Sequence, residues 1–316
     1  MKSAQIKSFG GSEVVEINQG TPALNDPSAG KVLVDVKAAG VNPADWKIRE
    51  GYFQQMMQLQ FPSTLGMDFS GVIEKVGEGV PDFKQNDEVY GQAAVIRGGS
   101  GAFAEIALAN ADTIAHKPKI LSHEKAAGLP LVGVSAWQAL VETIGLSKGQ
   151  KILIHGGAGG IGSIAIQLAK HLGAYVATTV STNDKQFVKE ELGADEVIDY
   201  KTQTFEDLLP HEYDAVFDTV GGETYTRSFK ILKRGGIIVS MLEQPNQELM
   251  DRFGVKAISQ FTQVNRERLT KLAQWVDQNN IRVNIDRTFP LDEAGKALDY
   301  QRDVHPRGKV VLQVSK

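Results

Sequence analysis

The chain of 316 residues contains no cysteine, and this absence excludes disulfide bonds, thiolate metal ligands and thiol nucleophiles. No apolar run approaches the roughly 20 residues of a membrane-spanning helix, and the N-terminus lacks the apolar core of a signal peptide. Basic residues form no block, and the net charge is −4. We therefore expect no nucleic acid and no membrane as partner, and a cytoplasmic location.

The composition is that of an ordinary soluble globular protein, with 42% hydrophobic and 23% charged residues. A chain of 316 residues is long enough for two domains that each bury a core of their own. No internal repeat or low-complexity segment is visible. The division of the chain therefore has to be inferred from the spacing of its apolar residues.

The first part of the chain is predicted to be mostly β-structure, because short alternating runs are separated by Gly and Pro turns. Many short strands of this kind favour a compact β barrel or sandwich. We predict that the C-terminal tail returns to this domain, so that residues 1–123 and 266–316 form one discontinuous domain. The strands are expected at 14–17, 31–36, 70–76, 87–90 and 309–314, and the tail helices at 266–278 and 291–300.

Residues 124–265 alternate between strand and helix spacing, which predicts an α/β domain with a doubly wound parallel sheet. A helix is expected over 126–144, with Ser122 as its N-cap and a break at Pro130. The other helices are expected at 184–192, 205–209 and 224–232, the last of them ended by Gly235 and Gly236. The other strands are expected at 174–180, 196–199, 213–218, 237–242 and 257–262.

The stretch KILIHGGAGGIGSIAIQLAK at residues 151–170 carries the strongest local signal. A buried strand, a G-x-G-x-x-G loop and an amphipathic helix follow one another, which is the context of a dinucleotide site. Gly157 would allow the tight turn, Gly159 the approach of a pyrophosphate, and Gly162 the packing of helix on strand. The helix N-terminus would then face the phosphates. The alternative is a Gly-rich turn without a ligand.

The tip of the next strand indicates which coenzyme is bound. An acidic residue usually holds the ribose 2′-hydroxyl of NADH there, but this strand ends in Thr-Thr-Val-Ser-Thr. Ser181 and Lys185 offer donors to a 2′-phosphate, worth a preference for NADPH of about ten- to a hundredfold. Asp184 has the wrong sign for this site. The alternative for Lys185 is a solvated residue in the first turn of a helix.

Motifs along nearly the whole chain resemble the medium-chain dehydrogenase/reductase superfamily, in particular its zinc-free, zeta-crystallin-like branch of NADPH:quinone oxidoreductases. They occur in family order: GVNPADWKIREG (40–51), LGMDFSGVIEKVGEGV (65–80), GVSAWQAL (133–140), HGGAGGIGSIAIQLAK (155–170), LGADEVIDY (192–200), FDTVGG (217–222), FTQVNRERL (261–269) and HPRGKVVL (305–312). The resemblance implies a GroES-like β-barrel catalytic domain (1–123 and 266–316) and a Rossmann NADPH-binding domain (124–265).

The resemblance also implies a chain without metal. Zinc-bearing relatives have a cysteine ligand where this chain has Asn42, a histidine where it has Met67, and a third ligand near Val132. None of these side chains replaces a thiolate or an imidazole at zinc. Dehydrogenase architecture without Lewis-acid chemistry is therefore expected.

The resemblance further implies a set of cofactor contacts and a homodimer formed through the Rossmann sheet edge near residues 237–242. The residues expected at the pyrophosphate are Ala158, Gly159, Gly160 and Ile161. Those expected at the 2′-phosphate and adenine are Ser181, Lys185 and Tyr200, and those at the nicotinamide half are Val220, Ser240, Leu242, Phe261 and Gln263. The tail residue Arg307 could reach the phosphate, but it is equally well explained as part of a surface turn.

The reacting centre is expected in the segment after Gly40-Val41-Asn42. Asn42 is predicted to donate its amide to a carbonyl oxygen as hydride arrives, unless it only forms the turn before Pro43. Lys47 or Tyr52 is a candidate to stabilise or protonate an enolate, unless it is simply solvated. Asp45 is interpreted as a structural helix cap. Trp46 and Phe53 would complete the wall of the pocket.

The predicted function is hydride transfer from NADPH to a quinone without metal. The pair Trp46-Lys47 departs from the common quinone-reductase motif and resembles members that reduce enals and enones, so double-bond reduction is the alternative. A non-catalytic NADPH-binding protein is the alternative of a different class. His155 is interpreted as a packing residue, Asp218 as the cap of a loop, and Met56, Met57 and Met67 as adaptable wall.

Overall fold

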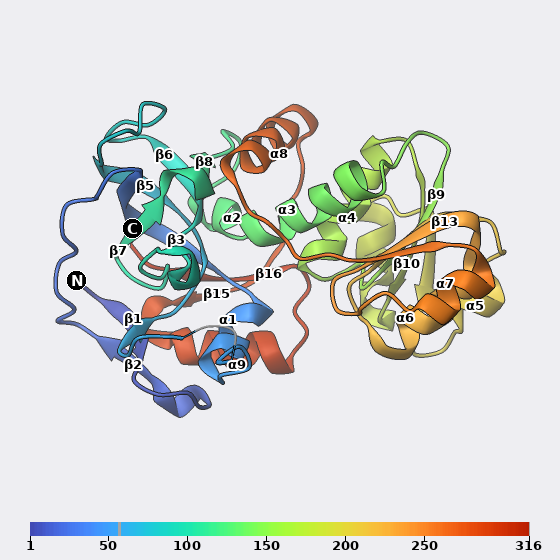
Figure 1. Cartoon of the computed structure of the whole chain (residues 1–316), viewed down its shortest axis with the longest axis horizontal. Helices are drawn as coiled ribbons and strands as arrows, with labels where there is room; N and C mark the ends of the chain where they lie inside the picture. Colours follow the sequence, from blue (N-terminus) through green and yellow to red (C-terminus); the bar gives the residue numbers. More distant parts are fainter. Residues whose placement is uncertain (56–57, 316) are drawn as a thin grey trace. The chain divides into compact units, whose positions relative to one another are not determined.

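The computed structural model describes residues 1–55 and 58–315, and the chain divides into two compact units (Figure 1). The first unit consists of Met1–Leu131 and Val264–Lys316, and the second of Val132–Gln263. The first division falls after the predicted position because helix α2 (His123–Ala127) packs on strands of the first unit. Met56 and Met57 lie outside the described residues.

The first unit is built from two mainly antiparallel sheets. A three-stranded sheet has the order β2-β1-β4, and a larger sheet has the order β15-β16-β3-β5-β6-β8, with β7 paired to β3. The strands are β1 (Ser3–Ile6), β2 (Val15–Asn18), β3 (Lys31–Val41), β4 (Ser63–Thr64), β5 (Asp68–Val76), β6 (Glu88–Gln92), β7 (Ile106–Asn110), β8 (Ile114–His116), β15 (Ile285–Pro290) and β16 (Lys309–Gln313).

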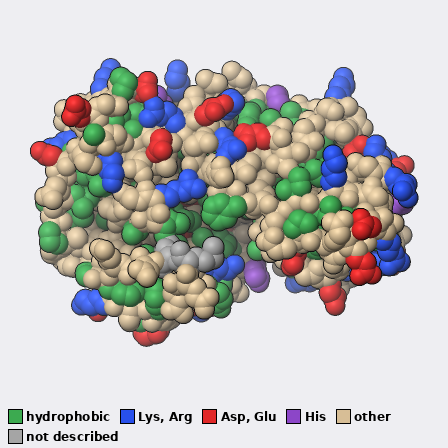
Figure 2. Space-filling model, in the orientation of Figure 1, with side chains coloured by type: hydrophobic (Ala, Val, Ile, Leu, Met, Phe, Trp, Pro, Cys, Tyr) green, Lys and Arg blue, Asp and Glu red, His purple; other side chains and the backbone are tan. Residues whose placement is uncertain are grey.

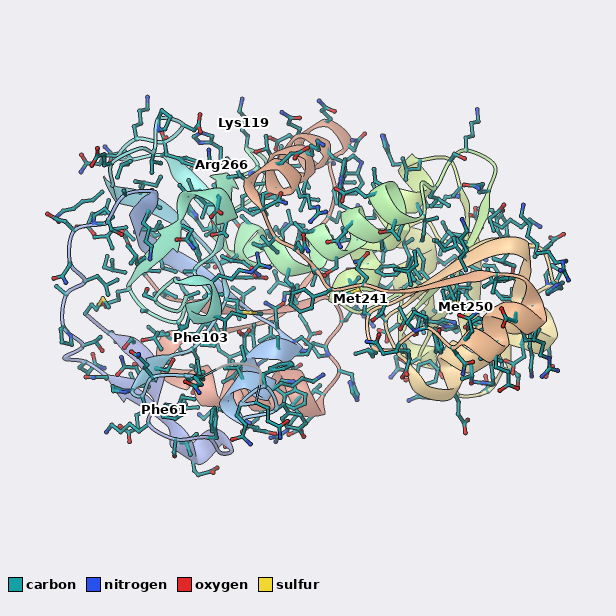
Figure 3. All side chains as sticks on the ribbon, in the orientation of Figure 1. Phe61, Phe103, Lys119, Met241, Met250 and Arg266 are labelled. Atoms are coloured by element: carbon teal, nitrogen blue, oxygen red, sulfur yellow. The ribbon has the colours of Figure 1, made fainter. Side chains whose placement is uncertain are left out.

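The core of this unit lies under β3 and β5, whose inward residues are fully buried. Phe103, labelled in Figure 3, belongs to the same core and is fully buried. Gly66 passes so close that an added Cβ would lie 2.2 Å from the Phe103 ring, at a φ of 89°. Only glycine fits this turn, which leads the chain from β4 into β5.

Four α-helices and the C-terminal strand complete the first unit. Pro43 opens α1 at the first helical position, where its missing N–H is tolerated. Ser122 caps α2 as predicted, since its Oγ accepts the N–H of Lys125 at 3.4 Å. Strand β16 pairs antiparallel with β3, so the tail completes this unit. The helices are α1 (Pro43–Arg49), α2, α8 (Arg266–Asn279) and α9 (Ala294–Asp303).

The second unit confirms the predicted doubly wound fold. Its six strands are all parallel, in the order β11-β10-β9-β12-β13-β14. Helix α4 packs on β9 and β10. The strands are β9 (Lys151–His155), β10 (Tyr175–Val180), β11 (Glu196–Asp199), β12 (Tyr213–Asp218), β13 (Leu232–Ser240) and β14 (Lys256–Ser259). The helices are α3 (Pro130–Trp137), α4 (Gly160–His171), α5 (Phe205–Leu208), α6 (Gly222–Ser228) and α7 (Gln247–Phe253).

Two predictions about β13 are wrong. The helix expected over 224–232 ends at Ile231, because Leu232 already pairs with Tyr213 as the first residue of β13. Gly235, with a φ of 80°, therefore sits at an irregularity inside the strand and does not end a helix. Because β14 pairs along β13, residues 237–242 are not the sheet edge expected to form a dimer. That edge is β14.

The helix predicted over 126–144 is interrupted after Ala127, and Pro130 begins the next helix, α3. Helix α3 continues as a π-helical segment over Gln138–Thr143. In the described part of the chain no helix combines the length and apolar character that crossing a membrane requires. Figure 2 shows Lys and Arg side chains interspersed with acidic ones over the visible face.

Candidate functional site

The loop between β9 and α4 is held by close packing. Its turn is made at Gly156, whose φ is 71°, and not at Gly157 as the motif had suggested. A Cβ on Gly157 would lie 2.0 Å from Thr178 Oγ1, and one on Gly162 would lie 2.2 Å from the carbonyl oxygen of Gly156. Gly162 therefore allows the helix to pack against the loop, as expected.

Gly159 differs from these glycines because space surrounds it. The nearest atom to an added Cβ is the Gly156 carbonyl oxygen at 3.4 Å. Gly159 is the N-cap of α4, and among the described residues no side chain caps this helix. The first N–H groups, which include those of Gly160 and Ile161, therefore keep their capacity for an anion. The loop fits the pyrophosphate of a dinucleotide, and Ala158 within it is buried.

The expected adenosine end lies at the tips of β10 and β11. Lys185 and Tyr200 are exposed there, whereas the Ser181 hydroxyl donates to Asp184 Oδ2 at 2.6 Å. A hydrogen bond from Thr182 holds the pKa of Asp199 below its usual range, and the nearby charge of Lys185 adds to this effect. The site thus offers a lysine to a phosphate, but Asp184 competes for the serine.

The expected nicotinamide end gathers exposed apolar side chains at the carboxyl edge of the sheet. Phe261 is 74% exposed, and Val220 and Leu242 are about half exposed. Ser240, in contrast, is fully buried, and its hydroxyl donates to Asp218 Oδ2 at 2.7 Å and accepts the N–H of Leu242. Ser240 therefore shapes this edge through the backbone that it holds.

Two residues that the sequence did not identify as site residues organise this edge. Asp218 accepts the N–H groups of Val220 and Gly221 at 3.0 and 2.9 Å, which confirms its interpretation as a loop cap. Gln138 reaches the segment after β14, where it donates to the Phe261 carbonyl at 3.2 Å and accepts the Gln263 N–H at 3.0 Å. A glutamine on an apolar helix was the available signal.

His155 at the end of β9 is a packing residue, as interpreted. Its two ring nitrogens lie 2.9 Å from Thr179 Oγ1 and 2.8 Å from Ser228 Oγ. Burial lowers the pKa of His155 to about 4, so the ring is neutral at physiological pH. The neutral His155 ring therefore does not serve as a catalytic acid.

The first unit holds a second polar centre, buried between α1, β5, β6 and β16. Asp68 Oδ2 accepts from Asn42 Nδ2 and from the N–H of Leu131, each at 3.0 Å, and Asp68 Oδ1 accepts from Gln92 Nε2 at 2.7 Å. The Lys309 ammonium donates to the Val41 carbonyl at 2.8 Å and to Asn42 Oδ1. Asn42, Asp68 and Lys309 are at most 4% exposed.

Asp45 joins this buried cluster from α1. Its Oδ2 accepts the N–H of Asn42 at 2.7 Å, which confirms the predicted helix cap. Burial and the neighbouring Asp68 raise the pKa of Asp45 to about 7, against the charge of Lys309. Burial also raises the pKa of Asp68 and lowers that of Lys309. Each group is pushed toward its neutral form because water does not reach it.

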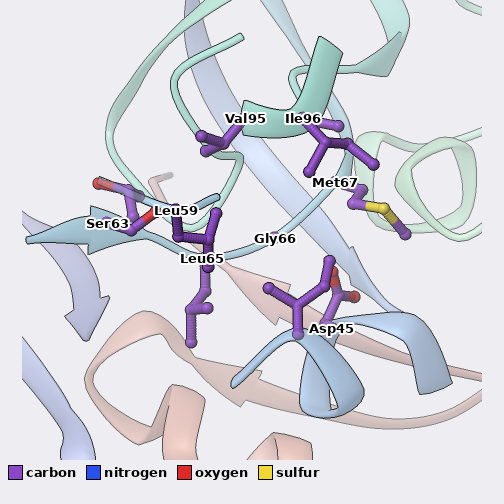
Figure 4. A pocket seen from close by; sticks show the side chains of 11 residues that line it. Asp45, Leu59, Ser63, Leu65, Gly66, Met67, Val95 and Ile96 are labelled. Atoms are coloured by element: carbon purple, nitrogen blue, oxygen red, sulfur yellow. The ribbon is translucent and has the colours of Figure 1, made fainter. Parts of the chain in front are cut away.

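A cavity of about 20 Å³ lies beside Asp45, which is enough for about one water. Figure 4 shows the side chains of Asp45, Met67 and Ile96 converging on it from three segments. Most of the lining is apolar, as is usual for a ligand site. Met67 is thus a wall residue, as interpreted, and the cavity is part of the first unit.

The other expected catalytic side chains lie along and just after α1. The Lys47 ammonium is 5.5 Å from the centroid of the Trp46 ring, and the Tyr52 ring meets the same ring edge-on at 5.6 Å. Tyr52 is 66% exposed, and Phe53 is half-buried. Tyr52 therefore reaches water and Lys47 is half-buried, whereas Asn42 is tied into the buried cluster.

The positions at which zinc-bearing relatives hold metal contain Asn42 and Met67 in the first unit and Val132 at the start of the second. Over residues 1–55 and 58–315, no three His, Asp or Glu side chains are grouped to hold a metal ion. Arg307 lies in the turn before β16, where its N–H donates to Asp286 Oδ1 at 3.3 Å. It belongs to the first unit, and its predicted contact with a phosphate stays a prediction.

Comparison with known proteins agrees with the family resemblance seen in the sequence motifs. A model described as "Alcohol dehydrogenase GroES-like domain" matches residues 28–119, and one described as "Zinc-binding dehydrogenase" matches residues 192–312. The chain is 35% identical to the mitochondrial NAD(P)H oxidoreductase RTN4IP1 of Mus musculus, over 98% of this chain and 88% of that protein. It is also 35% identical to the chloroplastic NADPH-dependent alkenal/one oxidoreductase of Arabidopsis thaliana, over 99% of this chain and 79% of that protein.

Among solved structures, the Escherichia coli quinone oxidoreductase complexed with NADPH superposes with a TM-score of 0.88. It is 29% identical and covers 99% of this chain, which in turn covers all of it. Nearly the whole chain therefore has a counterpart in one established architecture. On the identity, the coverage and the two matching domain models, the chain belongs to the medium-chain dehydrogenase/reductase superfamily, in its quinone oxidoreductase branch.

Proposed function

We propose that this protein is an NADPH-dependent quinone oxidoreductase that transfers hydride to a quinone without a metal ion. The loop at Gly156–Gly162 carries the proposal, because it leaves the N-terminus of α4 uncapped and Gly159 accessible. The similarity to an NADPH-complexed quinone oxidoreductase supports it. Asn42 and Met67 at the former metal positions support a metal-free reaction, since neither side chain is a zinc ligand of the usual kind.

The residues of the second unit fit the cofactor. Gly159, Gly160 and Ile161 would hold the pyrophosphate, Lys185 the 2′-phosphate, and the apolar side chains near Val220 the nicotinamide half. When bound, NADPH supplies a hydride. The full proposed contact set is Ala158, Gly159, Gly160, Ile161, Ser181, Lys185, Tyr200, Val220, Ser240, Leu242, Phe261, Gln263 and Arg307.

Asn42, Lys47 and Tyr52 are the proposed catalytic side chains. One of the two amide N–H bonds of Asn42 is donated to Asp68, which fixes the orientation of the amide. The other N–H suits a carbonyl oxygen on which charge develops. Lys47 and Tyr52 flank Trp46 and would stabilise the reduced acceptor.

Reduction of enals and enones is the second candidate. A relative named as an alkenal/one oxidoreductase is 35% identical to this chain, but so is the solved quinone oxidoreductase from Coxiella burnetii, so identity does not separate the two candidates. The pair Trp46-Lys47 is the observation that favours enal and enone reduction. Both reactions place a carbonyl compound at the same centre, and they differ in the atom that receives the hydride.

The test is steady-state oxidation of NADPH and of NADH by the purified protein, with a panel of quinones and a panel of enals and enones. We expect turnover with one panel and a clear preference for NADPH. NADPH binding seen by calorimetry without turnover of any acceptor would instead support a non-catalytic binding protein. Absence of binding would reject the proposal altogether.

A homodimer and a cytoplasmic location are also proposed. The edge available for a dimer is β14, and Ile258 on this strand is partly exposed. Sedimentation showing a monomer would reject the dimer. The relatives named above are mitochondrial and chloroplastic, so imaging of the tagged full chain has to decide the location.

A further inference from the structure

The two oxygens of Asp45 have different surroundings. Oδ2 accepts the N–H of Asn42 at 2.7 Å, whereas Oδ1 is fully buried and has no hydrogen-bond partner among the described residues. The Met67 N–H favours the ionised form, but it does not reach hydrogen-bond geometry with Oδ1. Because a buried polar atom without a partner is costly, such an atom points to a missing ligand or to a function.

The charges of the cluster also leave one proton to be placed. Asp68 from β5 and Lys309 from β16 are the charged groups that face Asp45. Arg49, on the same helix, is turned to Glu50 and to Asp299 of α9. Two carboxyl groups and one ammonium in a dry site are neutral only if one carboxyl group keeps its proton. Asp68 accepts three hydrogen bonds, so Asp45 is the group that holds it.

A cavity beside Asp45 offers a route for that proton. Asp45 lines the cavity of about 20 Å³, which is enough for about one water. The cavity is lined mainly by apolar side chains together with Ser63 and Thr64, and Ile96 at its wall is 46% exposed. A water hydrogen-bonded to Asp45 in this cavity would link the buried carboxyl group to an acceptor molecule bound outside the cavity.

We propose that Asp45 is the proton donor of the reduction, and that its Oδ1 proton passes through one water in this cavity to the carbonyl oxygen of the acceptor. This inference rests on the proposed function. With an enone, hydride from NADPH forms a C–H bond at the β carbon, the C=C π electrons shift, and the carbonyl oxygen takes the proton. The products are NADP⁺ and an enol, which tautomerises in water.

Asp45 is left as a carboxylate, which the Asn42 N–H and the charge of Lys309 stabilise until a solvent proton returns. A pKa of about 7 suits an acid that must donate and recover a proton near neutral pH. Tyr52 is exposed and Lys47 is half-buried beside Trp46, and neither residue lines the cavity.

The first experiment observes the proton directly, without activity. Infrared difference spectra of the full chain labelled with ¹³C-aspartate are recorded between pH 5.5 and 9, without NADPH. We expect a protonated carboxyl band that disappears with a midpoint near pH 7 and is absent from Asp45→Asn. If Asp45→Asn leaves the band unchanged, or if no band is present, the inference is overturned. Asp68→Asn should move the midpoint to lower pH, because it removes the like charge.

The second experiment follows turnover. The amide of Asp45→Asn still accepts the Asn42 N–H but cannot transfer a proton, so kcat should fall about 10²–10³-fold with KM little changed. Asp112→Asn, at an exposed aspartate of the same unit, should keep the parent kcat. If the parent reduces an acceptor and Asp45→Asn does so at the same rate at every pH, the inference fails and the proposed function stands. If the parent reduces nothing, the proposed function fails, and the infrared band still reports whether Asp45 is protonated.

Discussion

Two buried aspartates, one in each unit, show how differently the two halves of this protein use a carboxylate. Asp218 and Asp68 are both inaccessible to solvent, and both accept three hydrogen bonds. The donors to Asp218 are two backbone N–H groups from the loop after β12 and the hydroxyl of Ser240, the last residue of β13. Asp68 instead shares its site with the Lys309 ammonium and a second acid, Asp45.

The difference lies in what each site depends on. Asp218 holds a loop with neutral donors, so its role is to fix the shape of the edge that would meet the cofactor. The cluster around Asp68 depends on the balance between ammonium and carboxyl groups, and therefore on protons. We therefore propose that the second unit serves binding and the first serves proton chemistry. Four changes test this contrast.

The largest effect is expected from Lys309→Met, which keeps the length of the side chain but removes the ammonium. Asp68 and Asp45 would then share a dry site without a counter-charge. Leaving a buried carboxylate without its compensating charge costs about 3–5 kcal/mol of unfolding free energy. Urea unfolding at pH 8 measures the loss.

Lys119→Met is the matched control, since Lys119 is exposed on the same unit. It should change stability by less than about 0.5 kcal/mol. Equal stability of the Lys309 and Lys119 variants would show that the cluster does not depend on its charge balance, and the contrast with Asp218 would disappear.

Asp45 should give the protein a distinctive dependence of stability on pH. Its pKa is raised from 3.8 to about 7 on folding, so in this window the folded chain keeps a proton that the unfolded chain has released. The contribution of Asp45 to unfolding free energy therefore falls as pH rises, by at most about 1.4 kcal/mol per pH unit, and is constant above the window.

Asp45→Asn removes this slope and leaves all other groups in place. The unfolding free energy of the parent minus that of the variant, from urea unfolding at a series of pH values, should thus fall steadily up to about pH 7 and then stay level. A difference that does not vary with pH would mean that Asp45 is ionised throughout.

For the second unit the sharpest test is Gly159→Ala. The backbone at Gly159 has φ −74° and ψ 176°, which alanine adopts, and the nearest atom to the new methyl group is 3.4 Å away. The fold should be unchanged, while the methyl group occupies the approach of the pyrophosphate. NADPH affinity should fall about tenfold, or ~1.4 kcal/mol, by calorimetry.

Gly20→Ala is the control for that change, because an added Cβ there meets only Asn18 Oδ1 at 3.8 Å. It should bind NADPH like the parent. Unchanged affinity of both variants would argue that the pyrophosphate does not lie on this loop.

The parts of the fold that the sequence predicts correctly are those with local signals. The strands of the second unit are apolar runs between glycines, and the loop at Gly156–Gly162 is recognisable from its spacing. Leu232 was misassigned because its neighbours Lys233 and Arg234 suit a helix, whereas pairing with Tyr213 decides its structure. Tertiary pairing overrides local preference at such positions.

The buried cluster of Asp45, Asp68 and Lys309 was not predictable from the sequence in the same way. Asp45, Asp68 and Lys309 come from three distant segments, and no spacing rule joins them. Two of them leave a sequence signal, since Asp68 interrupts the apolar run before Phe69 and Lys309 directly precedes two valines. An isolated charge inside an apolar run signals a buried partner, but only the fold identifies that partner.

The smallest expected effect concerns the 2′-phosphate of NADPH. Lys185→Ala removes an exposed charge, so the preference for NADPH over NADH should fall about fivefold, or ~1 kcal/mol, in the ratio of kcat/KM values. Lys189→Ala, at an exposed lysine one turn further on, should leave the ratio unchanged. Asp184→Asn should raise the ratio, because it removes the carboxylate that takes the Ser181 hydroxyl. If the ratio responds to neither Lys185 nor Asp184, the tips of β10 and β11 do not select the coenzyme, and the second unit binds its ligand through the loop before α4 alone.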